Sequence, residues 1–570
     1  MRGIVAAPGM ALAPAYIVTQ PEVCTEKRTI TDVAEEMERL TSTASACYSQ
    51  IEGIMDALDG SVDSQTVEIL DFQLLLLEDT DFIGKIENAV SAQEVNAEYA
   101  IQSVSEEYIA MLNDITDNDY LRGRVADVSD LSQRLINELS GVGNKTAEPE
   151  GPYIAVGRDI APSKVAELDK SKLKGIVLEE GGITSHCVIL ARSLGIPCLI
   201  EATGILLELA PDDLLLLDAV SGEALIDPDA GRTQAYREYI AGKEKEKASL
   251  IKYISLKSES LDGIEMKVFA NVATSAEAAD VVGQGGEGVG LFRSELLYMS
   301  QQWRAPTEEA QYAEYSAAAK ALEGRPLIIR TLDVGGDKQI SYIDIGREDN
   351  PFLGYRAIRY CLDHHEIFMP QIAAMLRAGN DGDVQMMFPM ITCKKEILEA
   401  RQIVARVRDD LDAKGVAFDH DMKIGMMVET PAAAADAGIL AKSVDFFSIG
   451  TNDLSQYLFA ADRANAKLTA LNTPFQPTLL RVINVISTAA REEGIEVDIC
   501  GQAAEVDELI PVWLAMGITN LSVSIPRITA VRRRIRSLRK SECELLLDNV
   551  LRLETVEEVR QELREFSERS

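Results

Sequence analysis

The chain has 570 residues and carries 56 lysine and arginine residues against 92 aspartate and glutamate residues, a net charge of −36. Its 46% of hydrophobic and 26% of charged residues are ordinary for a folded protein and exclude a mainly disordered chain, and about 150 residues per domain predicts three or four domains. The acidic balance argues against nucleic acid or an anionic membrane as the main partner, because like charges repel.

The first residues and the cysteines bear on where the protein works. Residues 1–15 resemble a signal peptide in composition, but Pro8, Gly9 and Pro14 interrupt the apolar segment, so we predict a buried strand and turn. No apolar run reaches the roughly 18 residues that span a bilayer. The eight cysteines are scattered without a CxxC motif, which is typical of reduced thiols. These features predict a cytoplasmic protein.

The N-terminal half divides into segments that differ in composition and in the spacing of their apolar residues. Residues 30–140 contain no proline, and apolar residues recur there at helical spacing, which predicts a bundle of helices. From about residue 151, short apolar runs alternate with helical stretches and glycine turns, which predicts a compact α/β unit. The charged segment 231–257 predicts a helix that links this unit to the rest of the chain.

Eight short apolar runs alternate with helical patterning in the C-terminal half. They span residues 266–270, 289–292, 327–330, 384–390, 423–428, 445–449, 496–500 and 520–525. Eight strands alternating with helices over about 300 residues predict a (β/α)₈ barrel, the TIM-barrel fold.

Barrel enzymes place their chemistry where the strands end, and the residues there are strongly polar. These strand-end residues are Asn271, Arg293, Arg330, Asp333, Glu429, Asn452, Asp453 and Cys500. Glu429 and Asp453 could hold a divalent cation such as Mg²⁺, which takes one or two protein carboxylates. Arginines suit phosphate because their planar fork donates two parallel hydrogen bonds. The rim therefore predicts a site for a small phosphorylated acid, although unrelated salt bridges at loop starts are an alternative.

A second candidate site lies at residues 181–197. His186, one of four histidines in the chain, follows a glycine turn and opens an apolar, helix-like run. A histidine at a helix N-terminus is well placed to carry a phosphoryl group, because free amides and the helix dipole favour anions there. Thr184 or Ser185 could orient the imidazole. The residues alone leave a capping or packing histidine equally open.

Three other motifs are not interpreted as functional. Residues 283–288 match GxGxxG, but they lie between a helical stretch and a strand, the reverse of the dinucleotide fingerprint, and predict a turn. The basic run 531–540 is interpreted as the solvated face of a late barrel helix. His364 and His365 are adjacent, so they would point apart on a helix rather than share a metal.

The motifs together resemble those of the phosphoenolpyruvate-utilising enzymes, and in particular of Enzyme I of the sugar phosphotransferase system. The resemblance runs in order over essentially the whole chain. It is carried by GGITSHCVILARSLGIP (181–197), GLFRSELLYM (290–299), RTLDVGGDK (330–338), NPFLGYRAIR (350–359), MMVETPAAA (426–434) and FFSIGTNDLSQY (446–457).

This resemblance implies a role for each matching residue. His186 would accept the phosphoryl group of phosphoenolpyruvate, with Thr184 supporting it, and Cys500 would protonate the methylene carbon of the departing enolate. Glu429 and Asp453 would bind Mg²⁺. The phosphate and carboxylate of the substrate would be bound by Arg293, Arg330, Lys338, Arg356, Asn452 and Arg463.

The resemblance also implies the domains and the partners. An α/β phosphohistidine domain (1–22 and 144–228) would carry a helical insert (23–143), followed by a linker helix (229–258) and the barrel (259–570). The insert would dock the phosphocarrier protein HPr, which takes the phosphoryl group from His186. His186 must then visit two sites, which implies a hinge near residues 225–260. Members of the family dimerise through the barrel, so a homodimer is expected.

Three positions depart from the usual family pattern. Gln502 replaces a usual glutamate two residues after Cys500, Ile183 stands where many members have arginine, and Gln73 replaces a common histidine in the insert. These changes would suit a specialised paralogue that uses another carrier protein.

Two other functions compete with phosphoryl transfer to a carrier. One is a Mg²⁺-dependent barrel lyase, which leaves His186 and the helical insert unexplained. The other is a regulatory protein that senses phosphoenolpyruvate and turns over poorly, for which the altered segment after Cys500 is the support.

Overall fold

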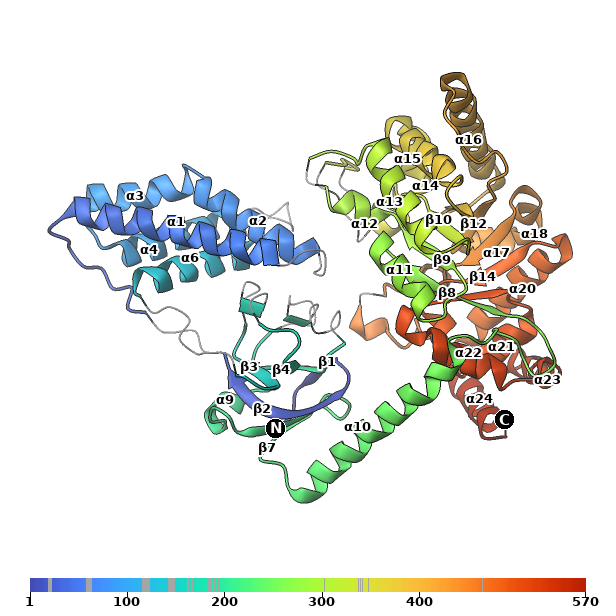
Figure 1. Ribbon diagram of the computed structural model, residues 1–570, viewed down its shortest axis with the longest axis horizontal. Helices are drawn as coiled ribbons and strands as arrows, with labels where there is room; N and C mark the ends of the chain where they lie inside the picture. Colours follow the sequence, from blue (N-terminus) through green and yellow to red (C-terminus); the bar gives the residue numbers. More distant parts are fainter. Residues whose placement is uncertain are drawn as a thin grey trace. The chain divides into compact units, whose positions relative to one another are not determined.

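The computed structural model describes residues 1–18, 23–57, 64–114, 124–141, 149–160, 164, 165, 168–181, 187, 188, 191, 195–301, 303–336, 338, 340, 342–346, 348–463 and 465–569. The chain divides into two compact units, Met1–Glu244 and Lys245–Ser570. Figure 1 shows the helices and strands of both units.

The first unit is built on a seven-stranded sheet in the order β1-β5-β4-β3-β2-β6-β7. Strands β2 to β5 form its parallel centre, while β1, β6 and β7 pair antiparallel at its edges. The first strands confirm that residues 1–15 form strand and turn. The strands are β1 (Ile4–Ala7), β2 (Met10–Ile17), β3 (Tyr153–Gly157), β4 (Leu173–Leu178), β5 (Cys198–Ile200), β6 (Leu214–Asp218) and β7 (Glu223–Ile226), with the short helix α9 (Ile205–Glu208) between β5 and β6.

A group of helices occupies the chain between β2 and β3 and confirms the predicted helical bundle. Its core consists of apolar side chains that recur at helical spacing, such as Phe82, Ile86 and Val90 on one helix. Gln73 is fully buried there, and its Nε2 donates to Asp130 Oδ2 at 2.9 Å. The helices are α1 (Val33–Ala57), α2 (Ser64–Glu78), α3 (Phe82–Gln93), α4 (Ala97–Asp114) and α6 (Val125–Leu139).

The predicted linker segment is helical. Helix α10 (Ala230–Leu250) continues into a 3₁₀ turn, η1 (Ile251–Tyr253), and the boundary between the two units falls within α10. No described helix is long and apolar enough to cross a membrane.

The second unit is a closed barrel of eight parallel strands, which confirms the predicted (β/α)₈ fold. Each predicted apolar run overlaps one strand, and β8 and β9 extend one or two residues beyond their runs. The strands are β8 (Lys267–Val272), β9 (Val289–Arg293), β10 (Leu327–Arg330), β11 (Val384–Phe388), β12 (Ile424–Val428), β13 (Phe446–Ile449), β14 (Glu496–Ile499) and β15 (Asn520–Val523).

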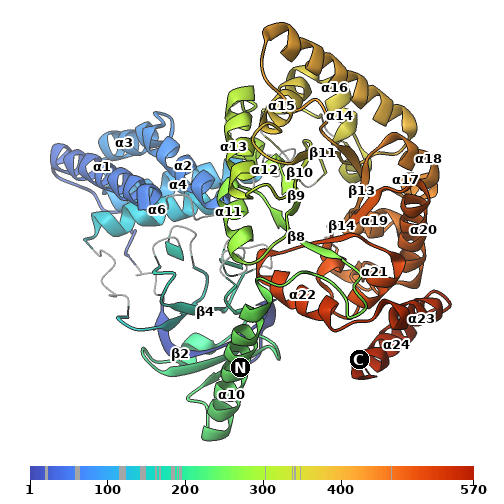
Figure 2. The ribbon, with the colours of Figure 1, turned by 45° about the vertical axis from the view of Figure 1, so that its right-hand side comes forward.

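Helices surround the barrel strands (Figure 2). They are α11 (Ser275–Gly283), α12 (Glu295–Met299), α13 (Glu308–Ala321), α14 (Ile358–Asp363), α15 (His365–Ala378), α16 (Lys394–Lys414), α17 (Pro431–Ala435), α18 (Ala437–Leu440), α19 (Thr451–Leu458), α20 (Pro477–Glu493), α21 (Ile510–Met516), α22 (Ile528–Arg536), α23 (Lys540–Val550) and α24 (Val556–Arg569).

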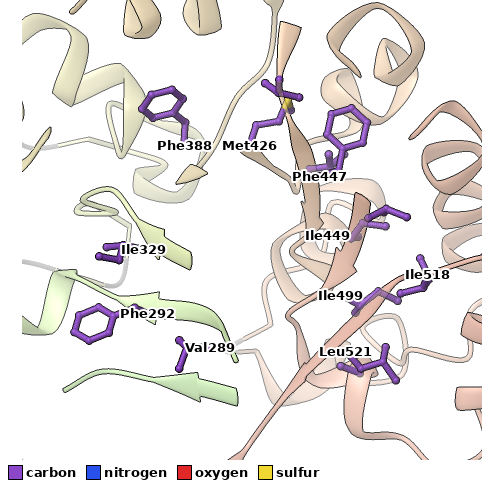
Figure 3. Close-up of a cluster of buried hydrophobic side chains, with 14 of the residues drawn as sticks. Val289, Phe292, Ile329, Phe388, Met426, Phe447, Ile449, Ile499, Ile518 and Leu521 are labelled. Carbon is purple, nitrogen blue, oxygen red and sulfur yellow. The ribbon is translucent and has the colours of Figure 1, made fainter. Parts of the chain in front are cut away.

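Successive side chains of each barrel strand point to opposite sides, and the two sides form two separate apolar cores. One set of side chains, including Phe292, Ile329 and Phe447, packs with apolar residues of the surrounding helices (Figure 3). The opposite set forms a separate apolar cluster of Phe269, Leu291, Ile328, Met387, Met427, Phe446 and Cys500. Two residues further along their strands, the second set becomes polar at Arg293, Arg330 and Glu429. This change from apolar to polar places a charged layer at the carboxyl end of the barrel.

Two sequence interpretations outside the site have clear outcomes. Residues 283–288 connect α11 to β9, which confirms a helix-to-strand turn. The interpretation of 531–540 as a solvated face is wrong for Arg532, which is fully buried. Its guanidinium donates to Tyr253 O at 2.9 Å and to Ser258 Oγ at 2.8 Å. Burial of this arginine depends on backbone acceptors far away in the sequence, which the local charge pattern does not reveal.

Candidate active site

The polar residues predicted at the strand ends lie where the barrel strands finish. Arg293 and Arg330 are the last residues of β9 and β10, Glu429 follows β12 directly, and Cys500 follows β14. Asn452 and Asp453 lie in the first turn of α19. Since the strands are parallel and closed into one barrel, these positions share one rim.

One part of the rim is a compact network of buried cations and carboxylates. Asp333 forms three ion pairs. Its Oδ2 lies 2.7 Å from Lys338 Nζ and 3.2 Å from Arg330 Nη1, and its Oδ1 lies 2.9 Å from Arg356 Nη2. Glu295 Oε1 is bonded to Arg330 Nη2 and accepts from Lys338 Nζ at 2.9 Å. The structure therefore brings Arg330, Lys338 and Arg356 together, as the sequence predicts.

The carboxylates of this network are ionised. Burial raises the pKa of Asp333, but attraction by Lys338, Arg330 and Arg356 outweighs it and holds the pKa well below its ordinary value. In the same way burial acts against the ionised form of Glu295, while Arg330 and Lys338 lower its pKa overall. The two carboxylates of this network are thus fully compensated by its three cations.

A second part of the rim holds two carboxylates with little compensation. Glu429 is fully buried; its Oε1 accepts from Met390 N at 2.6 Å, but Oε2 lacks a hydrogen-bond partner among the described residues. Burial, followed by the like charges of Asp453 and Asp333, raises the pKa of Glu429 to about 8. Asp453 Oδ1 also has no hydrogen-bond partner within the described ranges, although Arg463 Nη1 lies 3.5 Å away.

This carboxylate pair suits a divalent cation. A cation would supply the positive charge that Glu429 and Asp453 lack, and carboxylate oxygens are the ligands that Mg²⁺ prefers. A Cβ at Gly450 would lie 2.8 Å from Glu429 Oε2, so only a glycine leaves room for this carboxylate. Within the described part of the chain no group of three or more His, Cys, Asp or Glu side chains could hold a metal. A metal here would therefore take further oxygens from water or substrate.

Cys500 is a neutral thiol beside these charges. It is 6% exposed, and its Sγ lies 3.6 Å from Ile449 O. Burial is the main cause that raises the pKa of this thiol to about 12. Asn271 Nδ2 donates to Cys500 O at 3.3 Å, so a residue of β8 fixes the backbone at this position.

The remaining predicted binding residues lie at the edge of the site. Arg293 is exposed. Asn452 Oδ1 accepts from Gln502 N at 3.1 Å. Arg463 has its backbone N bonded to Gln456 Oε1 at 3.1 Å, and its guanidinium faces Asp453.

The predicted nucleophile His186, with Thr184 and Ile183, lies outside the described residues. The next residue, Cys187, is 1% exposed, and its Sγ donates to Ile160 O at 3.0 Å. The turn at residues 179–181 follows β4, so the parallel centre of the first unit leads into the histidine segment.

Two residues of the site were missed by sequence reasoning. Glu295 lies in α12, two residues after the end of β9, and bonds both Arg330 and Lys338. Tyr457 lies in α19, and its hydroxyl accepts from Arg356 Nη1 at 3.1 Å. Glu295 could have been found from its position just past a strand end, two residues after Arg293. Tyr457 could have been found from its spacing of four residues from Asp453.

Comparison with known proteins agrees with this geometry. Three family models match: the N-terminal region of phosphoenolpyruvate-utilising enzymes at residues 2–124, their mobile domain at 149–222, and their phosphoenolpyruvate-binding domain at 247–540. The phosphoenolpyruvate-protein phosphotransferase of Priestia megaterium is 37% identical over 98% of this chain and 97% of its own length. The chain belongs to the phosphoenolpyruvate-protein phosphotransferase family.

A second relative gives the same result. The phosphoenolpyruvate-protein phosphotransferase of Bacillus subtilis is 36% identical over 98% of both chains. Among solved structures, the solution structure of an Enzyme I protein (nEIt) is 26% identical, with a TM-score of 0.39, over 43% of this chain and 99% of its own. The segment that matches the phosphoenolpyruvate-binding domain, residues 247–540, includes every barrel residue assigned to the site.

Proposed function

We propose that this protein transfers the phosphoryl group of phosphoenolpyruvate to His186 and from there to the phosphocarrier protein HPr, releasing pyruvate as the first step of the sugar phosphotransferase system. The observation that carries the proposal is the convergence of Arg330, Lys338 and Arg356 beside the Glu429–Asp453 pair, whose charge is only weakly compensated, at one barrel rim. Membership in the phosphotransferase family and the match of the mobile domain to residues 149–222 support it.

The charges of the site suit this substrate. The predicted site includes the five cations Arg293, Arg330, Lys338, Arg356 and Arg463 and the four carboxylates Glu295, Asp333, Glu429 and Asp453, so with every group ionised it carries one net positive charge. A divalent metal raises the excess to three, equal to the negative charge of fully ionised phosphoenolpyruvate. Arg330 and Arg356 would hold the ligand bidentately, and Arg293, Asn452 and Arg463 would close on it from the edge.

Glu429 and Asp453 would hold Mg²⁺. When bound there, the metal supplies positive charge to substrate oxygens and stabilises negative charge that develops on the leaving enolate. Its binding favours the ionised form of Glu429, which burial alone disfavours.

The chain's own residues would carry the phosphoryl group and the proton. A ring nitrogen of His186, oriented by Thr184, forms the bond to phosphorus as the bond from phosphorus to the enol oxygen breaks. The methylene carbon of the enolate then takes the proton of the Cys500 thiol and becomes the methyl group of pyruvate. The sulfur keeps the electron pair and regains a proton from solvent. A thiol with a raised pKa is neutral before the step, as an acid must be.

The partners follow from the same proposal. The helical insert (23–143) would dock HPr, and the α/β domain (1–22 and 144–228) would swing on the linker (229–258) between HPr and the barrel (259–570). A homodimer through the barrel and a cytoplasmic location complete the proposal.

Incubation with phosphoenolpyruvate and Mg²⁺, followed by intact mass and an acid-lability test, tests this function. We expect a gain of one acid-labile phosphoryl group, absent in His186→Ala and discharged by HPr. A gain that survives His186→Ala would place the nucleophile elsewhere.

A second candidate is a phosphoenolpyruvate-sensing paralogue with low turnover or a different carrier protein. Gln502, which replaces a usual glutamate of the family, bonds through its backbone to Asn452, so the altered segment touches the predicted substrate site. Tight binding of phosphoenolpyruvate with negligible release of pyruvate would favour this candidate. Phosphorylated protein that HPr does not discharge would favour another carrier.

A further inference from the structure

Helix α19 presents two functional side chains four residues apart. Asp453 and Tyr457 are separated by about one helical turn, so both lie on the same face of the helix. Asp453 is one of the carboxylates placed to hold the metal. Tyr457 is half-buried, and its hydroxyl has a different set of neighbours.

The Tyr457 hydroxyl joins α19 to the segment that follows β10. It accepts from Arg356 Nη1 at 3.1 Å and donates to Phe352 O at 2.5 Å. Phe352 lies in the 3₁₀ turn η2 (Pro351–Leu353), four residues before Arg356. One phenol oxygen therefore fixes both the guanidinium and the backbone of the same segment.

Arg356 depends on few contacts for its orientation. It is 1% exposed; Nη2 donates to Asp333 Oδ1, Nη1 donates to Tyr457, and Nε has no hydrogen-bond partner in the part of the chain that the structure describes. The backbone around it is constrained as well. Ala357 has a φ of +53°, a conformation unfavourable for alanine, and a Cβ at Gly335 would lie 2.6 Å from Arg356 Cβ. Such a conformation persists where surrounding contacts enforce it, and the Tyr457 hydroxyl provides two of them.

We propose that Tyr457 is a positioning residue for phosphoenolpyruvate: its hydroxyl holds Arg356 against α19, so that the segment bearing Arg356 and the helix bearing Asp453 keep one geometry before substrate binds. The inference rests on the proposed function and deepens it. Tyr457 touches neither the reacting atoms nor the metal in this scheme, and acts through Arg356 alone.

Tyr457→Phe removes the hydroxyl and keeps the ring, so the packing of α19 is retained. We expect the KM for phosphoenolpyruvate to rise about tenfold while kcat stays within about twofold, because the arginine is no longer held in place. Mn²⁺ binding in the absence of substrate should be unchanged. Tyr355→Phe is the matched control: it removes a hydroxyl next to Arg356 in sequence that donates to Asp363 Oδ2 at 2.7 Å, and it should leave KM unchanged.

A double-mutant cycle separates positioning from a general structural role. Arg356→Lys removes the planar fork, so adding Tyr457→Phe to that variant should raise KM by less than about twofold. An equal, about tenfold effect of Tyr457→Phe in both backgrounds would overturn the proposal, as would an unchanged KM in Tyr457→Phe alone. An unchanged KM in Arg356→Lys would overturn the assignment of Arg356 to the substrate, and with it the proposed function of this rim.

Discussion

Two carboxylate pairs stand at the mouth of the barrel, and they differ in how their charge is balanced. Glu295 and Asp333 are bonded by Arg330, Lys338 and Arg356, and their pKa values are lowered. Glu429 and Asp453 are buried with a single ion pair between them among the described residues, that of Asp453 with Arg463 at 3.5 Å, and the pKa of Glu429 is raised. The first pair belongs to the architecture of the folded protein, whereas the second pair is the one that we propose holds a divalent cation.

The largest expected effect is on catalysis at the second pair. Glu429→Gln should lower the rate of phosphoryl transfer from phosphoenolpyruvate by about a thousandfold, because it removes one of the two proposed metal ligands. The unfolding temperature of the metal-free protein at neutral pH should not fall, because Glu429 is then mostly uncharged and glutamine keeps its shape and the oxygen that accepts from Met390 N. A large loss of stability in Glu429→Gln would break the comparison. Single-turnover phosphorylation and calorimetry measure the two quantities.

The opposite outcome is expected at the first pair. Asp333→Asn leaves Lys338, Arg330 and Arg356 with less negative charge in a buried site, so the free energy of unfolding should fall by about 3 kcal/mol. Denaturant unfolding at neutral pH, read by circular dichroism, checks this value. If the Asp333→Asn variant is as stable as the unmodified protein, the network is not structural.

The pH dependence of stability should have opposite signs at the two pairs. Glu429 has a folded pKa of about 8, above its ordinary value of 4.5, so the metal-free protein should lose stability as pH rises from 4.5 through 8. The pKa of Asp333 is lowered, so its contribution is present above its ordinary value of 3.8 and is lost as pH falls below it.

Glu429→Gln is the control for this pH profile. Burial also raises the pKa of Asp498 to about 7, which acts in the same direction in both proteins, so their difference isolates Glu429. Mg²⁺ should restore the stability lost by the unmodified protein at pH 9 and leave Glu429→Gln unchanged. Identical profiles for the two proteins would contradict the raised pKa.

The sequence predicts the barrel well because its pattern is local. Each strand is a short apolar run, and the polar residue that ends it, such as Arg330 or Glu429, is adjacent in sequence. The roles of Tyr457 and Glu295 are not predicted from local sequence, because they depend on contacts with other segments. Tyr457 contacts Arg356, and Glu295 contacts Arg330 and Lys338. The prediction for Arg532 is wrong for the same reason, because its burial depends on carbonyls more than 200 residues away.

The most direct test of the central claim is a Mn²⁺ titration, followed by electron paramagnetic resonance, of the unmodified protein, Glu429→Gln and Asp333→Asn, the last under conditions where it remains folded. We predict one site per chain in the unmodified protein, retained in Asp333→Asn and lost in Glu429→Gln. Retention of the site in Glu429→Gln together with its loss in Asp333→Asn would contradict the division of the rim into a structural pair and a metal-binding pair.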